Sequence, residues 1–129
     1  MTTLIARPVE DRLRTTLAVD AVVVGLSGVL LAATPSSWYG DLPGWLVRLG
    51  GILVALAAVE VGLASRWRGQ RLRLAGTVTA DLAFGWTVLV VVAVEAFGVR
   101  GAGLEVLGFS GLATLVFGIL ETSLVRALR

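Results

Sequence analysis

Apolar residues fill four stretches of the chain, and each stretch is about twenty residues long. The stretches cover residues 15–34, 46–65, 76–97 and 106–125, and each contains only one or two charged residues. A helix of about 20 apolar residues crosses the hydrocarbon core of a bilayer. The pattern therefore predicts an all-α chain, a four-transmembrane-helix bundle that forms a single membrane domain over residues 1–129.

Two pairs of acidic residues inside these stretches share one separation. Asp20 and Asp81 are 61 residues apart, and so are Glu60 and Glu121. Polar residues are scarce inside membrane spans, so chance matches between them should be rare. The shared separation therefore indicates an internal repeat of 61 residues.

Each unit of this repeat is predicted to be a helical hairpin. The first unit covers residues 8–68 and the second covers residues 69–129. Two spans per unit is an even number, so both units would have the same orientation and be related by a pseudo-two-fold axis along the membrane normal. Residues that break helices lie between the two spans of each unit: Pro35, Gly40, Pro43 and Gly44 in the first, and Gly98, Gly101 and Gly103 in the second.

Arginine supplies all eleven basic residues, and its distribution is uneven. Only Arg48, at the start of the second stretch, and Arg100 lie in or beside the two connections inside the hairpins. The other nine lie in the N-terminal segment, the middle connection and the C-terminal tail: Arg7, Arg12, Arg14, Arg66, Arg68, Arg71, Arg73, Arg126 and Arg129. Cytoplasmic segments of membrane proteins carry such an excess. We therefore predict a multi-pass protein of the plasma membrane with both termini cytoplasmic.

Other features of the composition indicate which partners and which cofactors to expect. The basic cytoplasmic segments are suited to the headgroups of anionic lipids. No soluble basic domain remains to bind nucleic acid, so we expect no nucleic-acid partner. The chain has no cysteine, histidine or lysine. Thiolate and imidazole ligands are therefore absent, and we expect no metal and no cofactor.

The four repeated carboxyl groups are the candidate proton donors and acceptors. Asp20, Glu60, Asp81 and Glu121 each lie five to eight residues from the nearest flanking arginine. At 1.5 Å of rise per residue, all four fall about 7 to 12 Å from the cytoplasmic boundary. A carboxyl group that faces lipid is costly. We therefore expect one carboxylate layer that points into the bundle or toward a protein partner.

In the first interpretation the layer is structural, because arginine side chains can reach down to this depth. The candidate charge partners are Arg14, Arg66, Arg68, Arg71, Arg73 and Arg126. The protein would then be a non-enzymatic accessory or structural membrane module, and this is the function toward which the sequence leans. Four helices enclose four carboxyl groups poorly, so a homo-oligomer or another membrane protein is the expected partner.

Two other interpretations need at least one carboxyl group without an arginine. Crowded carboxyl groups do not all ionise together, so one would keep an exchangeable proton. A proton-coupled or cation transporter would use that proton, with Glu95 as a second station about 21 Å beyond Asp81.

In the third interpretation a membrane-embedded acid catalyst would protonate a prenyl-like substrate for isomerisation or cyclisation. Aromatic faces that could steady the resulting positive charge are Phe84, Trp86, Phe109 and Phe117. Trp86 lies about 140° around its helix from Asp81, so we do not expect it on the same face as that carboxyl group.

The run Leu-Arg-Thr-Thr-Leu-Ala-Val-Asp-Ala from Leu13, the Pro/Gly turn and the Leu-x-Arg-x-Gly-Gly entry at residues 46–51 resemble small four-span membrane proteins of actinobacterial type. This resemblance implies the topology only, since that group has no established activity. The length also resembles small multidrug-resistance transporters and fluoride channels. However, the arginine bias argues against the antiparallel assembly that both of those use.

Overall fold

The structure is a computed structural model that describes the backbone of residues 2–128 and the side chains of residues 8–128. Each of its four α-helices is long and apolar enough to cross a membrane, which agrees with the predicted all-α class and four spans. The helices are α1 (Thr2–Ala33), α2 (Gly44–Ala64), α3 (Gly69–Phe97) and α4 (Gly101–Ala127), and a short 3-10 helix, η1 (Ser36–Tyr39), precedes α2.

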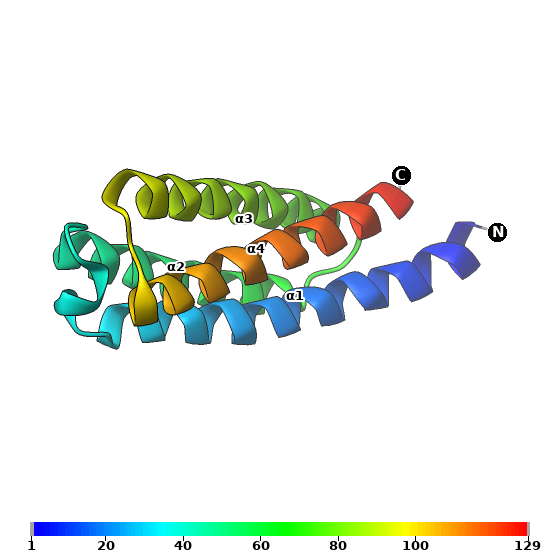
Figure 1. The fold of residues 1–129 in the computed structure, drawn as a ribbon. Coiled ribbons are helices and arrows are strands. Elements are labelled where there is room, and N and C mark those ends of the chain that lie inside the picture. The colour runs from blue at the N-terminus through cyan, green and yellow to red at the C-terminus, as the bar shows by residue number, and fades with distance from the viewer. Residues whose placement is uncertain (1, 129) are drawn as a thin grey trace.

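The four helices form two antiparallel hairpins, α1 with α2 and α3 with α4 (Figure 1). Helix α1 also packs along α4, and this contact joins the hairpins. Helices α2 and α3 hardly touch each other, so the bundle is closed on one side and open on the other. Both termini lie at the end that carries the α2–α3 connection (Figure 1). The side of the membrane on which this end lies, and the 61-residue repeat, stay predictions.

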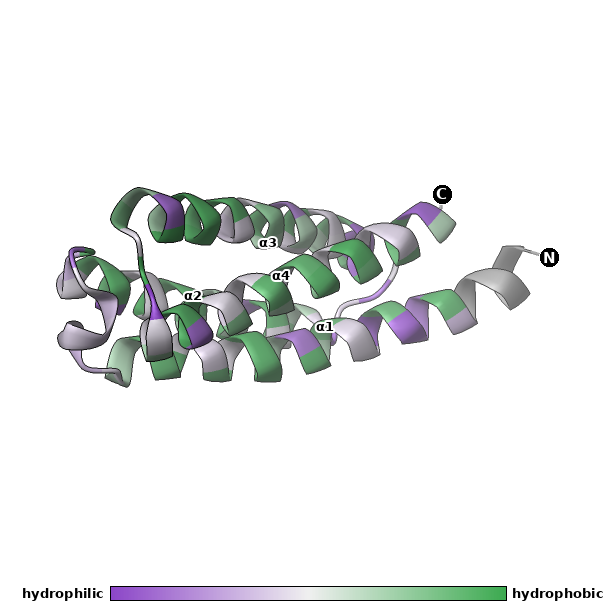
Figure 2. Ribbon diagram, viewed as in Figure 1, coloured by the Kyte–Doolittle hydropathy of each residue, from purple (hydrophilic) through white to green (hydrophobic). Residues whose placement is uncertain are grey.

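The outer faces of the helices present apolar side chains. Leu26, Leu56, Leu82 and Leu112, one from each helix, are each about 60% exposed. Figure 2 shows hydrophobic residues along all four helices and hydrophilic residues concentrated toward their ends. Such a surface is stable in lipid and would be costly in water.

Two glycines allow α1 and α2 to approach closely. A Cβ atom added at Gly28 would lie 2.7 Å from the carbonyl oxygen of Gly51, and one added at Gly51 would lie 2.5 Å from the carbonyl oxygen of Gly28. Small residues at such crossings let helix backbones pack in lipid, where no hydrophobic driving force joins the helices. The close packing of α1 on α2 therefore requires glycine at these two positions.

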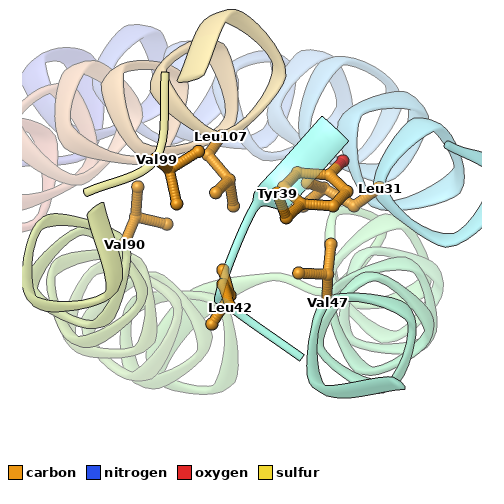
Figure 3. Close-up of a cluster of buried hydrophobic side chains, with 7 residues drawn as sticks. All are labelled: Leu31, Tyr39, Leu42, Val47, Val90, Val99 and Leu107. Carbon is orange, nitrogen blue, oxygen red and sulfur yellow. The ribbon is translucent and has the colours of Figure 1, made fainter. Parts of the chain in front are cut away.

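A buried cluster closes the bundle at the end away from the termini. Tyr39 of η1 inserts between the hairpins (Figure 3) and is only 1% exposed. Its hydroxyl group hydrogen-bonds the hydroxyl group of Thr34. The cluster consists of Leu31, Tyr39, Leu42, Val47, Val90, Val99 and Leu107. The connection between α1 and α2 therefore serves as a lid on this end of the bundle.

Replacing Tyr39 with phenylalanine should lower the free energy of unfolding by about 1 kcal/mol, because the variant loses one buried hydrogen bond but keeps the ring. Unfolding in mixed micelles, followed by circular dichroism, measures the change. Trp38→Phe is the control, since Trp38 is exposed in the same 3-10 helix. Equal stability of both variants would contradict the role of the Tyr39 hydroxyl group.

Candidate functional site

Asp20 of α1 and Glu121 of α4 form a buried carboxyl pair at the α1–α4 contact. Asp20 is 5% exposed and Glu121 is fully buried. Their carboxyl groups lie next to one another. The i, i+4, i+11 spacing of buried residues Ser110, Thr114 and Glu121 places all three on the interior face of α4.

The carboxyl pair has no counter-charge from the described side chains. The one ion pair within 4.0 Å among them joins Arg14 to Asp11, at 3.9 Å. The Nε atom of Arg14 donates instead to the carbonyl oxygen of Ser65, at 3.1 Å. Oδ2 of Asp20 and both carboxyl oxygens of Glu121 have no hydrogen-bond partner among the described residues. Because an ionised carboxylate only accepts, a bond between these two groups requires a proton.

A group of hydrogen-bonded hydroxyl side chains lies along the middle of the bundle, farther from the termini than the carboxyl pair. Thr114 and Thr87 hydrogen-bond each other at 2.8 Å. One turn farther along α4, the Ser110 hydroxyl lies 3.0 Å from that of Ser27 and accepts the indole N–H of Trp86 at 2.9 Å. These bonds tie α1, α3 and α4 together with polar groups, as expected for helices that pack in lipid.

A small cavity opens beside Asp20. Its volume is about 70 Å³, and its lining includes Asp20, Thr79, Trp86 and Thr114 among apolar side chains of α2 and α3. A cavity of this size that has polar groups on its wall has room for a few water molecules or a small ligand group. Asp20 is therefore the member of the buried pair that borders this cavity.

The other carboxyl groups predicted from the sequence lie on the outside of the single chain. Glu60, Asp81 and Glu95 are all exposed. The sequence reasoning allowed each carboxyl of the layer to face either the interior or a partner, and the chain itself encloses only Asp20 and Glu121. On α3, the buried residues Thr79, Ala80 and Ala83 turn toward the bundle, so Asp81 points away from it.

The predicted aromatic residues differ in position. Trp86 lies on the cavity next to Asp20. This position agrees with its 140° offset from Asp81, because Asp81 faces outward. Phe84 packs against Gly118, whose added Cβ would lie 3.0 Å from the ring. Phe117 is partly buried and Phe109 is exposed. Of the four aromatic residues, only Trp86 lines this cavity.

Several of the predicted arginine partners lie near the chain ends and the α2–α3 connection. The guanidinium group of Arg71 stacks over the Trp67 ring at 4.6 Å. Arg66, Arg68 and Arg126 are exposed. Arg73 borders a surface pocket with Gln70, Leu74 and Thr77. Their contact with lipid headgroups stays a prediction.

Asp20 and Glu121 were predicted from the sequence as part of the carboxylate layer, whereas Thr87 was not connected to them. Small residues at Gly76, Ala80, Ala83 and Thr87 give i, i+4, i+7 and i+11 spacing, which is the pattern of a close helix contact. That pattern marks the face of α3 that meets α4.

Comparisons with family models, with curated proteins and with solved structures give no match to this chain. The function is therefore inferred from the geometry of the carboxyl pair and its surroundings.

Proposed function

We propose that this integral membrane protein exchanges protons for a cation at the Asp20–Glu121 pair, as a proton-coupled cation transporter does. One observation carries the proposal: both carboxyl groups are buried side by side, and no described arginine neutralises them. Two adjacent carboxylates in a medium of low dielectric constant repel each other strongly. A proton held between them, or a bound cation, relieves that repulsion.

The exchange follows from the chemistry of the pair. With one proton bound, the two carboxyl groups share a single negative charge and can hydrogen-bond each other. A monovalent cation that arrives at Asp20 from the cavity displaces that proton, which leaves through the same cavity, so the net charge of the site is unchanged. Release of the cation allows the proton to return. Thr114 lines the same cavity as Asp20, and its hydroxyl group, bonded to that of Thr87, offers further oxygen atoms to a proton or a cation.

The test uses purified protein in liposomes that carry a pH-sensitive dye inside. An outward gradient of ethylammonium or of Na⁺ should drive proton movement in the natural protein. Asp20→Asn and Glu121→Gln should each lower the initial rate by at least about tenfold, since each variant removes one member of the pair. Asp81→Asn is the matched control, because Asp81 is the predicted repeat equivalent of Asp20 but faces outward.

Unfolding curves in micelles show whether each variant is folded. Unchanged flux in the folded Asp20→Asn and Glu121→Gln proteins would overturn the proposal. A loss of flux that is equal in the Asp81→Asn protein would also overturn it, because the effect would then not be specific to the buried pair.

A second candidate function, acid catalysis on a prenyl-like substrate, is favoured by the indole of Trp86 on the same small cavity as Asp20. An aromatic face beside a proton donor can stabilise a developing carbocation. Incubation of the reconstituted protein with a prenyl epoxide, followed by mass spectrometry of the extracted lipids, tests this candidate. The accessory role predicted from the sequence relied on arginine partners for the carboxyl groups, and the buried pair has none among the described side chains.

A further inference from the structure

The open side of the bundle contains a groove between α2 and α3, which Trp86 divides into two parts. Its inner part, near the α2–α3 connection, has a volume of about 240 Å³ and is lined by residues that include Glu60, Trp67 and Val78. Four residues line both this inner part and the cavity beside Asp20: Ala57, Val61, Thr79 and Leu82. The inner groove therefore leads from the outer surface of the bundle to the buried carboxyl pair.

Trp86 closes this path at the end that lies farther from the α2–α3 connection. Its indole N–H donates to Ser110, and the opposite edge of the ring reaches Gly50 of α2, where an added Cβ would lie 2.9 Å from the ring. The ring also lines the outer part of the groove, which lies nearer the α1–α2 connection. This outer part is apolar and has a volume of about 300 Å³. Trp86 thus spans the groove and separates the cavity of Asp20 from the outer part.

The charges along the path have one sign. Glu60 lies on the inner groove, and Asp20 lies at its end with an Oδ2 atom that has no partner among the described residues. The four side chains shared by the inner groove and the cavity are uncharged, and three of them are aliphatic: Ala57, Val61 and Leu82. A ligand that fits must carry a positive group on an apolar body.

We infer that a lipophilic amine enters from the bilayer through the inner groove and binds with its ammonium group at Asp20 and its apolar body between α2 and α3. This inference rests on the proposed exchange at the Asp20–Glu121 pair and specifies its cation. The ammonium group forms a charge-assisted hydrogen bond with the carboxyl pair and lies beside the indole of Trp86. The alkyl part replaces lipid in the inner groove, whose volume of about 240 Å³ lies just below the range of small-molecule pockets, about 300 to 1,000 Å³.

The test uses dodecylamine as the probe and dodecanol as its neutral counterpart. The protein, in nanodiscs, carries Trp38→Phe and Trp45→Phe, so that the remaining tryptophans are Trp67 on the inner groove and Trp86 on the cavity. Dodecylamine should change their emission with saturation. Dodecanol should bind at least about tenfold more weakly, because it cannot pair with the carboxyl groups. Asp20→Asn in the same background should weaken the binding of dodecylamine by a similar factor.

Two further variants test the route. Ala57→Phe and Val78→Phe fill the inner groove from α2 and from α3, and each should weaken dodecylamine binding by at least about tenfold through lost space. Leu56→Phe is the matched control, since Leu56 points into the surroundings one residue away. Its affinity should stay within about twofold of the starting protein, as expected for a surface change. Helical circular dichroism and an unfolding curve show that each variant is folded.

The possible results separate this inference from the proposed function. Equal binding of dodecanol would identify a neutral lipid site and overturn the inference. Binding that needs Asp20 but is unchanged in both folded groove variants would overturn the lateral route and leave the exchange at the pair intact. Unchanged dodecylamine binding in the Asp20→Asn protein would overturn the proposed ligand, while the Na⁺ arm of the flux assay would still test the carboxyl pair.

Discussion

Replacing Glu121 with leucine is expected to raise the free energy of unfolding by about 1 to 3 kcal/mol and to abolish proton exchange. The Glu121 side chain is fully buried, and apart from the adjacent Asp20 carboxyl group no described residue offers its oxygens a partner. Leucine fills a similar volume without a polar group that must be desolvated. A residue that lowers the stability of the folded protein is typically kept for its function. If Glu121 only held the bundle together, an apolar residue would serve better in its place.

The measurement is an unfolding titration with sodium dodecyl sulfate in bicelles, combined with the liposome flux assay. Glu121→Gln separates the two effects, since it removes the exchangeable proton but keeps a polar side chain in the bundle. We expect Glu121→Gln to lose flux with little gain in stability. A drop in stability of more than about 1 kcal/mol in the Glu121→Leu protein would show that Glu121 holds the helices together instead.

The Gly51→Leu variant should lose about 3 kcal/mol or more of stability, which is the largest loss that we expect from a single substitution. An added Cβ at Gly51 already lies 2.5 Å from the carbonyl oxygen of Gly28 and 2.7 Å from the amide nitrogen of Ala32. Backbone atoms cannot move aside as a flexible side chain can. Helix α1 would have to shift away from α2, and Asp20 would move with it.

The same bicelle titration measures this loss, and Gly85→Leu is its matched control. Gly85 also lies inside a membrane helix, but no atom outside its own helix backbone lies within 4 Å of an added Cβ. We expect Gly85→Leu to change stability by less than about 0.5 kcal/mol. Equal losses in the two variants would contradict the close crossing of α1 and α2.

The sequence predicts the four helices well because twenty apolar residues have one stable form in lipid. Every backbone polar group there must be paired within the helix. The boundaries were less accurate at the end that carries the termini. Helix α3 begins at Gly69, seven residues before the apolar stretch that starts at residue 76. Apolar composition marks where lipid begins, whereas a helix can continue into water beyond that point.

The site was predicted only in part, because depth along a helix follows from residue counting but contact between helices does not. The repeat suggested equal surroundings for Asp20 and Asp81. In the structure α1 packs on both α2 and α4, while α3 packs on α4 and leaves α2 open. This difference buries Asp20 and exposes Asp81. It also creates the groove, which no pattern in a single helix could indicate.

Infrared difference spectroscopy of the reconstituted protein tests the central claim most directly, because it detects the carbonyl stretch of a protonated carboxyl group. The account predicts this band at neutral pH, its loss when a saturating cation is added, and its absence from the Asp20→Asn/Glu121→Gln double variant. The band should persist in the Asp81→Asn protein. A spectrum without this band at neutral pH, or a band that the double variant retains, would contradict a proton held between Asp20 and Glu121.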